Sequence, residues 1–240
     1  MSAAPAEARA VAQGLEIAEP GWDWRPVDAS DRWRLVRSGV GKVNAAACIV
    51  SCLASNSTDE TPLVLNLGVC GALPGHGAPP IGSVVIASAS LYADEGIATP
   101  RGYEDMSAAG FPPWPGAGGG NDAGRGCSGV RAEQRVVQAA RERITDAIGP
   151  CVSVGPIATV STCSGTDALA REVAQRTGAI AEAMEGAAIA HALMRLRGSA
   201  RDFLEIRVVS NTTGDRHKQV WDLPGALVVL SRVARALRSG

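Results

Sequence analysis

The sequence lacks a long apolar segment. It contains no run of about 18 apolar residues, the length that a membrane-spanning helix needs. Residues 1–7 have neither a basic start nor an apolar core, so we expect no secretory signal there. An excess of one charge is also missing, because 23 Lys and Arg stand against 24 Asp and Glu, for a net charge of −1. This balance argues against a general nucleic-acid binder and a polybasic membrane protein.

Metal-binding patterns are absent as well. The six cysteines form no CxxC pair and the three histidines are scattered, so the ligand spacing of a structural zinc site is missing. Cysteines such as Cys48 and Cys70 lie in apolar segments, and we interpret them as small buried hydrophobic residues. We expect reduced thiols and a cytoplasmic location.

The composition is that of a globular protein. Of the 240 residues, 46% are hydrophobic, and this length favours one domain over two. Glycine is abundant, with 28 residues, which indicates tight turns and close backbone approaches of the kind found in ligand-binding α/β enzymes. We expect a single domain over residues 1–240, with a Gly/Pro-rich surface loop or lid at about 99–129.

Apolar patterns alternate between strand and helix. Apolar runs predict strands at 33–37, 63–67, 82–88, 151–160, 179–183 and 203–210. Helical spacing predicts helices at 7–15, 45–53, 131–148, from 166 onward, 185–197 and 222–237. A turn is expected at 68–71. The alternation predicts an α/β fold whose sheet is covered by helices on both faces.

Four glycine-rich or polar clusters follow predicted strands, at 39–44, 66–71, 161–167 and 211–215. Ligands bind outside the carboxyl ends of strands in open α/β sheets, so we expect these clusters to wall one pocket. Gly39 to Lys42 fits neither GxGxxG nor GxxxxGK[ST], so we expect no nucleoside triphosphate site there. The segment is either a turn that leads into a helix or a contact for a substrate phosphate or ribose. The 161–167 cluster lacks a nucleophile elbow, so we expect a loop that contacts a ligand or caps the next helix.

Two acidic residues flank the short strand at 179–183. Glu185 stands at the start of a helix of small residues. Its carboxylate is either simply stabilised by the helix dipole or accepts hydrogen bonds from a sugar diol. Strand alternation would place Glu182 on the other face from Glu185, so the two are not expected to pair. We expect Glu182 to be solvated or ion-paired, and Asp215 to be a turn residue.

Taken in order, several motifs resemble the nucleoside phosphorylase/nucleosidase family. They are Ser-Gly-Val-Gly-Lys-Val-Asn-Ala-Ala (38–46), Asn-Leu-Gly-Val-Cys-Gly-Ala-Leu (66–73), Val-Ser-Thr-Cys-Ser-Gly-Thr-Asp-Ala (160–168) and Ala-Glu-Ala-Met-Glu-Gly-Ala-Ala (181–188), with support from 92–100 and 210–216. Each motif is weak alone, whereas their joint order and spacing over roughly 33–237 is specific.

The resemblance implies one α/β domain with a central mixed, twisted and partly curled sheet flanked by helices. It implies an enzyme that breaks the N-glycosidic bond of a small-molecule nucleoside. It also implies a homo-oligomer, a dimer or higher, because in this family a neighbouring subunit often completes the active site. The resemblance implies no metal or organic cofactor and no nucleic-acid or membrane partner.

The resemblance also implies site residues. After Met184, Glu185 would bind the ribose 2′- and 3′-hydroxyls, because a carboxylate stabilises the oxocarbenium-like sugar of the transition state. Other expected substrate contacts are Val69, Cys70 and Gly71 at the sugar and base, and Thr162 and Cys163 near the purine.

Asn211 stands where adenine-specific members of the family carry Asp. Its amide offers a donor and an acceptor, which favours a 6-oxopurine such as hypoxanthine. Asn66 stands where related phosphorylases carry a phosphate-binding Arg, which favours hydrolysis over phosphorolysis.

Glu7 resembles the carboxylate that activates water in nucleosidases. Residues 1–4 are too short for the apolar strand that precedes it in the family, so either the sequence begins downstream of the native start or the sheet lacks that strand. Three alternatives stay open: a 6-oxopurine nucleoside phosphorylase, a methylthioadenosine/S-adenosylhomocysteine-type nucleosidase, and a nucleoside-binding protein without turnover.

Overall fold

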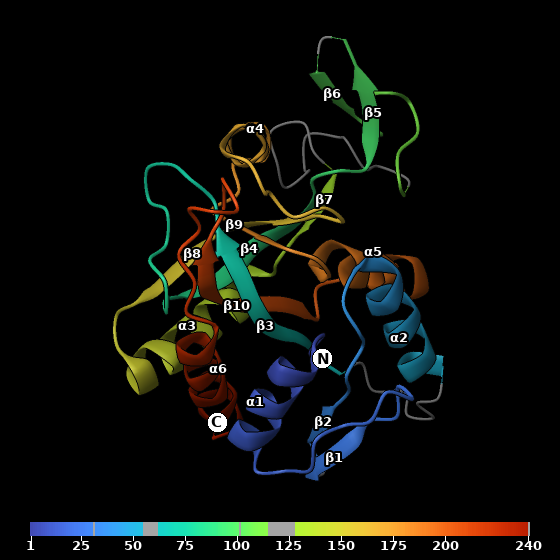
Figure 1. The fold of residues 1–240 in the computed structure, drawn as a ribbon. Helices are drawn as coiled ribbons and strands as arrows, with labels where there is room; N and C mark the ends of the chain where they lie inside the picture. Colours follow the sequence, from blue (N-terminus) through green and yellow to red (C-terminus); the bar gives the residue numbers. More distant parts are fainter. Residues whose placement is uncertain (31, 55–61, 101, 115–127, 240) are drawn as a thin grey trace.

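A six-stranded mixed sheet forms the centre of the protein, whose structure is a computed structural model that describes residues 1–30, 32–54, 62–100, 102–114 and 128–239 (Figure 1). The strand order is β10-β3-β9-β8-β4-β7. The strands are β3 (Val64–Ala72), β4 (Val84–Tyr92), β7 (Gly129–Arg131), β8 (Val152–Thr159), β9 (Ala181–Ala183) and β10 (Phe203–Thr212). The predicted α/β class is confirmed.

The sheet closes on itself. Strand β10 pairs in parallel with β3 and antiparallel with β4, so β10, β3, β9, β8 and β4 form a ring. Nearly every residue of β3, β4 and β10 is buried, as expected for strands that are apolar on both faces. The ring is the partly curled mixed sheet that the resemblance implies.

Two groups of helices cover the ring (Figure 1). On one side lie α1 (Pro5–Leu15), α3 (Gln134–Ile148) and α6 (Leu223–Arg238), which share a core with β3, β4 and β10. On the other side α2 (Lys42–Ala54) packs on α5 (Gly186–Arg197). The sixth described helix is α4 (Asp167–Thr177), whose N-cap Thr166 accepts from Leu169 N at 3.2 Å. No described helix is long and apolar enough to cross a bilayer.

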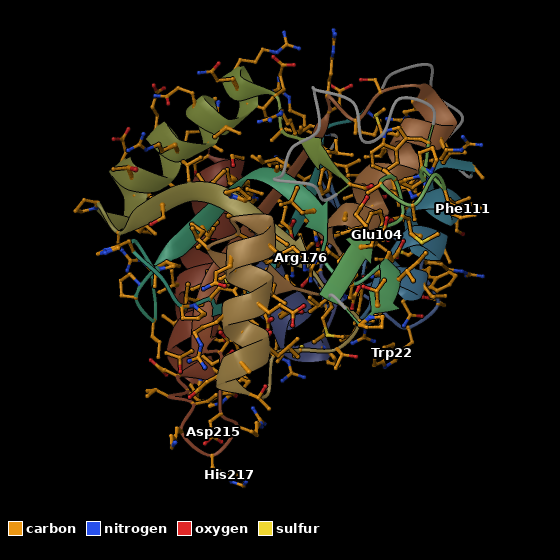
Figure 2. The ribbon with its side chains drawn as sticks, turned by 90° about the horizontal axis from the view of Figure 1, so that it is seen from above. Trp22, Glu104, Phe111, Arg176, Asp215 and His217 are labelled. Atoms are coloured by element: carbon orange, nitrogen blue, oxygen red, sulfur yellow. The ribbon has the colours of Figure 1, made fainter. Side chains whose placement is uncertain are left out.

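Two small hairpins lie outside the ring. One pairs β1 (Val27–Ser30) with β2 (Trp33–Leu35), and the other pairs β5 (Gly96–Thr99) with β6 (Gly102–Asp105). The Arg176 guanidinium of α4 lies 3.8 Å from the ring centroid of Tyr103 on β6, beside the second hairpin (Figure 2). This hairpin occupies the start of the predicted 99–129 loop, of which residues 101 and 115–127 lie outside the described part.

The first three residues run beside β3. Ser2 forms an isolated parallel bridge with Arg37, and Leu67 N donates to the Met1 carbonyl at 2.9 Å. In the described residues, the first strand expected from the resemblance is reduced to this bridge. The segment leads directly into α1 at Pro5, and Glu7 in the first turn of this helix lies against β3, where Val69 N donates to it.

The close approach of α1 to α6 leads to a stability prediction. A Cβ on Gly14 would lie 2.1 Å from the Ser231 carbonyl oxygen, so Gly14→Ala must force the two helices apart. We expect the free energy of unfolding in urea to fall by about 1–3 kcal/mol. The control is Gln13→Ala on the exposed face of α1, for which we expect a change within about 0.5 kcal/mol. Equal unfolding free energies for the two variants would show that the close approach is not needed.

Candidate active site

A cavity of about 580 Å³ lies where α1, β3, β9 and β10 converge. Each of the four predicted clusters contributes to its wall: Val40 from the first, Val69 to Gly71 from the second, Cys163 to Gly165 from the third and Asn211 from the fourth. Among the predicted site residues, Glu7, Val69, Cys70, Gly71, Cys163, Met184, Glu185 and Asn211 all line it. Thr162 does not line it, and its N–H instead donates to Asp94 at 3.4 Å.

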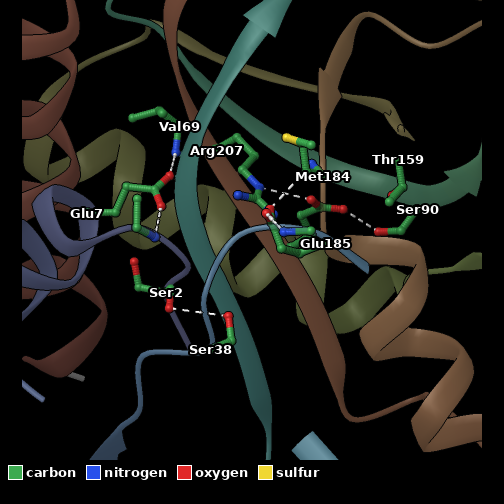
Figure 3. Close-up of polar contacts among 12 residues, drawn as sticks. Ser2, Glu7, Ser38, Val69, Ser90, Thr159, Met184, Glu185 and Arg207 are labelled. Carbon is green, nitrogen blue, oxygen red and sulfur yellow. Dashed lines mark hydrogen bonds and ion pairs between the residues drawn. The ribbon is translucent and has the colours of Figure 1, made fainter. Parts of the chain in front are cut away.

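Glu7 is buried in the first turn of α1 (Figure 3). Its two carboxylate oxygens accept from the backbone N–H groups of Ala4 and Val69, each at 2.7 Å, which fixes the carboxylate against β3. Burial raises the pKa of the Glu7 carboxyl, and the positive charge of Arg207 opposes that rise. A carboxylate with a raised pKa is suited to accept a proton from water near neutral pH.

A buried chain of charges lies next to Glu7 (Figure 3). Arg207 Nε donates to Glu205 Oε1 at 2.9 Å, and its Nη2 donates to Glu185 Oε2 at 3.0 Å. Ser90 Oγ donates to the second oxygen of Glu205 at 2.5 Å. Burial lowers the pKa of Arg207, but the carboxylates of Glu205, Glu185 and Glu7 outweigh it and raise that pKa overall. Arg207 therefore stays charged and holds Glu185 in place.

Sequence reasoning missed Glu205 and Arg207 as parts of the site. The available signal was two charged residues spaced i, i+2 within an otherwise apolar strand, which places both side chains on one face. Both side chains are almost completely buried, and Arg207 lines the cavity.

Gly68 explains why the turn predicted at 68–71 is wrong. The segment continues as β3 to Ala72, because its glycines make room for side chains rather than for a change of direction. A Cβ on Gly68 would lie 2.5 Å from Arg207 Nη1 and 2.6 Å from Glu7 Oε1. The glycine thus lets the carboxylate and the guanidinium approach each other at the strand.

Glu185 joins two of the predicted clusters. Its Oε1 accepts from Gly41 N at 3.0 Å, so the Gly39–Lys42 turn both leads into α2 and contacts this carboxylate. Glu185 is the N-cap residue of α5, yet its side chain makes no capping hydrogen bond. The carboxylate instead lines the cavity, where one oxygen meets Gly41 and the other meets Arg207.

The prediction for Glu182 is wrong. Its side chain is buried, and no basic side chain of the described residues forms an ion pair with it. Its oxygens accept from Ser164 N at 2.8 Å and Ser164 Oγ at 2.6 Å. Burial raises the pKa of Glu182, while these two hydrogen bonds oppose the rise. Since β9 ends at Ala183, strand alternation does not extend to Glu185, and both carboxylates line the cavity.

Asn211 lies near the end of β10 with its amide held from both sides. Ser210 Oγ donates to Asn211 Oδ1 at 2.9 Å, and Asn211 Nδ2 donates to the Thr212 carbonyl at 2.9 Å.

Asp215, four residues after Asn211, lies in an exposed loop and accepts from His217 N at 3.1 Å, so its predicted place in a turn is confirmed (Figure 2).

The remaining candidates for chemistry are inert in this arrangement. Desolvation and the carboxylates of Glu182 and Glu185 raise the pKa of the Cys163 thiol, which disfavours the nucleophilic thiolate. Asn66 is buried without lining the cavity. The described residues contain no group of three or more His, Cys, Asp or Glu that could hold a metal ion.

Comparison with known proteins identifies the family of the chain. Residues 29–237 match the phosphorylase superfamily. A futalosine hydrolase from Acidothermus cellulolyticus is 34% identical over 99% of this chain and 88% of its own length. A futalosine hydrolase from Streptomyces coelicolor is 33% identical over 92% of this chain and 83% of its own.

Solved structures share the fold at low sequence identity. The 5′-methylthioadenosine/S-adenosylhomocysteine nucleosidase of Neisseria meningitidis superposes with a TM-score of 0.70 at 21% identity, covering 100% of this chain and 97% of that one. A futalosine hydrolase mutant of Helicobacter pylori reaches a TM-score of 0.68 at 16% identity, covering 99% and 95%. The chain is a nucleosidase, a hydrolase of N-glycosyl bonds, and it belongs to the phosphorylase superfamily.

Proposed function

We propose that the protein hydrolyses futalosine to hypoxanthine and dehypoxanthine futalosine, a reaction of menaquinone biosynthesis. The observation that carries this proposal is that Glu7, Glu185 and Asn211, which the sequence resemblance assigns to water, ribose and purine, share one cavity. The futalosine hydrolases that resemble this chain over most of its length support the choice of substrate.

The proposed roles follow from the chemistry of the three side chains. Glu7, whose pKa is raised by burial, takes a proton from the water that attacks C1′ of the ribose. Glu185 accepts from the ribose hydroxyls and stabilises the positive charge that develops on the sugar. Asn211 supports the departing purine with its amide. Glu7 and Glu185 are held in place by hydrogen bonds before substrate binds. Each carboxylate then interacts with a proton or a positive charge that develops during the reaction.

The cavity also offers groups for the aromatic carboxylate of futalosine. Arg216 and Trp221 both line it, and the Arg216 guanidinium lies 4.8 Å from the centroid of the indole ring. A cation beside an aromatic face suits a substrate that carries an aromatic acid.

A base-release experiment tests the proposal. Futalosine, inosine and methylthioadenosine are each incubated with the protein, with and without phosphate, and free base is measured by chromatography. We expect hypoxanthine from futalosine at a rate that phosphate does not change, because no Arg stands at position 66 to hold phosphate.

The other outcomes identify the alternatives. Strict dependence on phosphate would mean a phosphorylase, and preferential release of adenine from methylthioadenosine would mean that type of nucleosidase. A rise in melting temperature without free base would mean a nucleoside-binding protein; saturation at 100 times the Kd adds about 2.7 kcal/mol of stability. The homo-oligomer is also a proposal, and light scattering at working concentration tests it.

A further inference from the structure

Three positions lie in register across neighbouring strands on the cavity wall. Asn211 of β10 is paired with Gly71 of β3, and Gly71 is paired with Glu182 of β9. Residues directly opposite one another in a sheet point to the same face. A Cβ on Gly71 would lie 2.8 Å from Thr213 Cγ2, 3.2 Å from Asn211 Nδ2 and 3.6 Å from Glu182 Cγ. The glycine makes room for the Thr213 methyl group and keeps the cavity wall open between the Asn211 amide and the Glu182 side chain, which both line the cavity. We call this stretch of the wall, from Asn211 to Glu182, the slot.

The amide end of the slot presents a hydrogen-bond donor. Ser210 Oγ occupies Asn211 Oδ1, and Nδ2 is the atom near Gly71. One N–H of this NH₂ group donates to the Thr212 carbonyl, and the other is left for a ligand. A β-bulge between Val209 and Asn211 interrupts the regular register of β10 at this point, as bulges do where a side chain is re-aimed.

The carboxylate end presents an acceptor. Each oxygen of Glu182 receives one hydrogen bond from Ser164, and a carboxylate oxygen can accept a second. Burial raises the pKa of Glu182, and the two Ser164 bonds oppose that rise by favouring the ionised form. The backbones of Asn211 on β10 and Glu182 on β9 are two strand spacings apart, which is roughly 10 Å. Their two side chains shorten this distance to one that suits a flat purine base.

We propose that Glu182 is a specificity-determining residue, whose carboxylate accepts the N1–H of a 6-oxopurine while Asn211 donates to the O6/N7 edge. This inference rests on the proposed function and names how the same site reads its base. A 6-oxopurine carries a proton on N1, whereas a 6-aminopurine has a bare acceptor there. With a 6-aminopurine, the carboxylate would face another acceptor and lose its hydrogen bond, which is how polar sites reject near analogues.

The variant Glu182→Gln tests this reading with two substrates, futalosine and 6-amino-6-deoxyfutalosine. We expect the kcat/KM of the variant for futalosine to fall about 10- to 100-fold. For the amino analogue it should stay constant or rise, because the Gln amide can donate to N1. Equal losses on both substrates would mean that Glu182 only anchors the 161–167 loop, and would overturn the proposal.

The matched control is Glu142→Gln, the same change at an exposed residue of α3 that does not line the cavity. It should leave kcat/KM for both substrates, and therefore their ratio, within a few-fold of the unaltered protein. A shift in that ratio as large as that of Glu182→Gln would show that the effect is not specific to Glu182, against the proposal.

A binding experiment on the unaltered protein needs neither a folded variant nor turnover. Calorimetry compares hypoxanthine, 1-methylhypoxanthine and adenine, of which only the first carries N1–H. We expect hypoxanthine to bind at least about 10-fold more tightly than the other two. Comparable affinities, or no binding of hypoxanthine, would overturn the role of Glu182. If hypoxanthine is preferred but futalosine is not cleaved, the proposed function fails and the role of Glu182 stands.

Discussion

Replacing Glu7 with glutamine should lower kcat/KM for futalosine by about 10²–10⁴-fold, the range typical of a lost general base. The amide keeps the size of the side chain but cannot take a proton from water. The position is sensitive because both carboxylate oxygens are already aligned by the N–H groups of Ala4 and Val69. Steady-state rates of hypoxanthine release measure the effect, and circular dichroism reports whether the fold is kept.

The pH dependence of the unaltered enzyme gives a second readout of Glu7. Water activation needs the ionised carboxylate, so kcat/KM should fall as the pH drops through the raised pKa of Glu7. The small residual activity of Glu7→Gln should lack that acidic limb. Glu16→Gln, at the exposed end of α1, is the control and should keep both rate and profile. An unchanged acidic limb in Glu7→Gln would assign the titration to another group.

Replacing Arg207 with methionine should lower the free energy of unfolding by about 3–5 kcal/mol, because it leaves buried carboxylates without a cation. Glu205 is fully buried and Glu185 nearly so, and Arg207 holds an ion pair with each. Urea unfolding at pH 7 measures the loss. The control is Arg9→Met, which breaks an exposed pair with Glu19 and should cost at most about 1 kcal/mol.

The pH dependence of this loss has a defined sign. Without the guanidinium, the folded-state pKa of Glu205, already raised by burial, rises further, whereas its unfolded-state value does not change. The stability deficit is therefore largest at high pH and shrinks as the pH falls and the carboxyls become protonated. Adding Glu205→Gln to the variant should recover part of the loss at pH 7. A deficit under 1 kcal/mol, or one independent of pH, would contradict a buried charge network.

The regular elements could be predicted where the apolar pattern was long. The helices that begin near Glu7 and Asp222 and the strand at Phe203 appear within a few residues of their expected bounds. The strands β1, β5, β6 and β7 were not foreseen, because these segments of three or four residues contain no apolar run. Closure of the ring by β10 and β4 also escapes sequence reasoning, because it depends on contacts distant in sequence.

The site was predictable as a set of residues but not as a network. Motifs near Glu7, Glu185 and Asn211 identified side chains that do meet in one cavity. The ion pairs of Arg207 and the buried position of Glu182 depend on strand register, which a single sequence does not reveal. The sequence also predicted a turn at Gly68, whereas the glycine in fact leaves room beside β3 for the side chains of Glu7 and Arg207.

Closure of the five-strand ring makes the cavity depend on β10, a strand near the end of the chain. Asn211 on β10 is paired with Gly71 on β3, far earlier in the chain, so the wall between these strands cannot exist until nearly the whole chain has been synthesised. Such non-local pairing slows folding. A nascent chain that still lacks β10 therefore lacks this wall of the cavity.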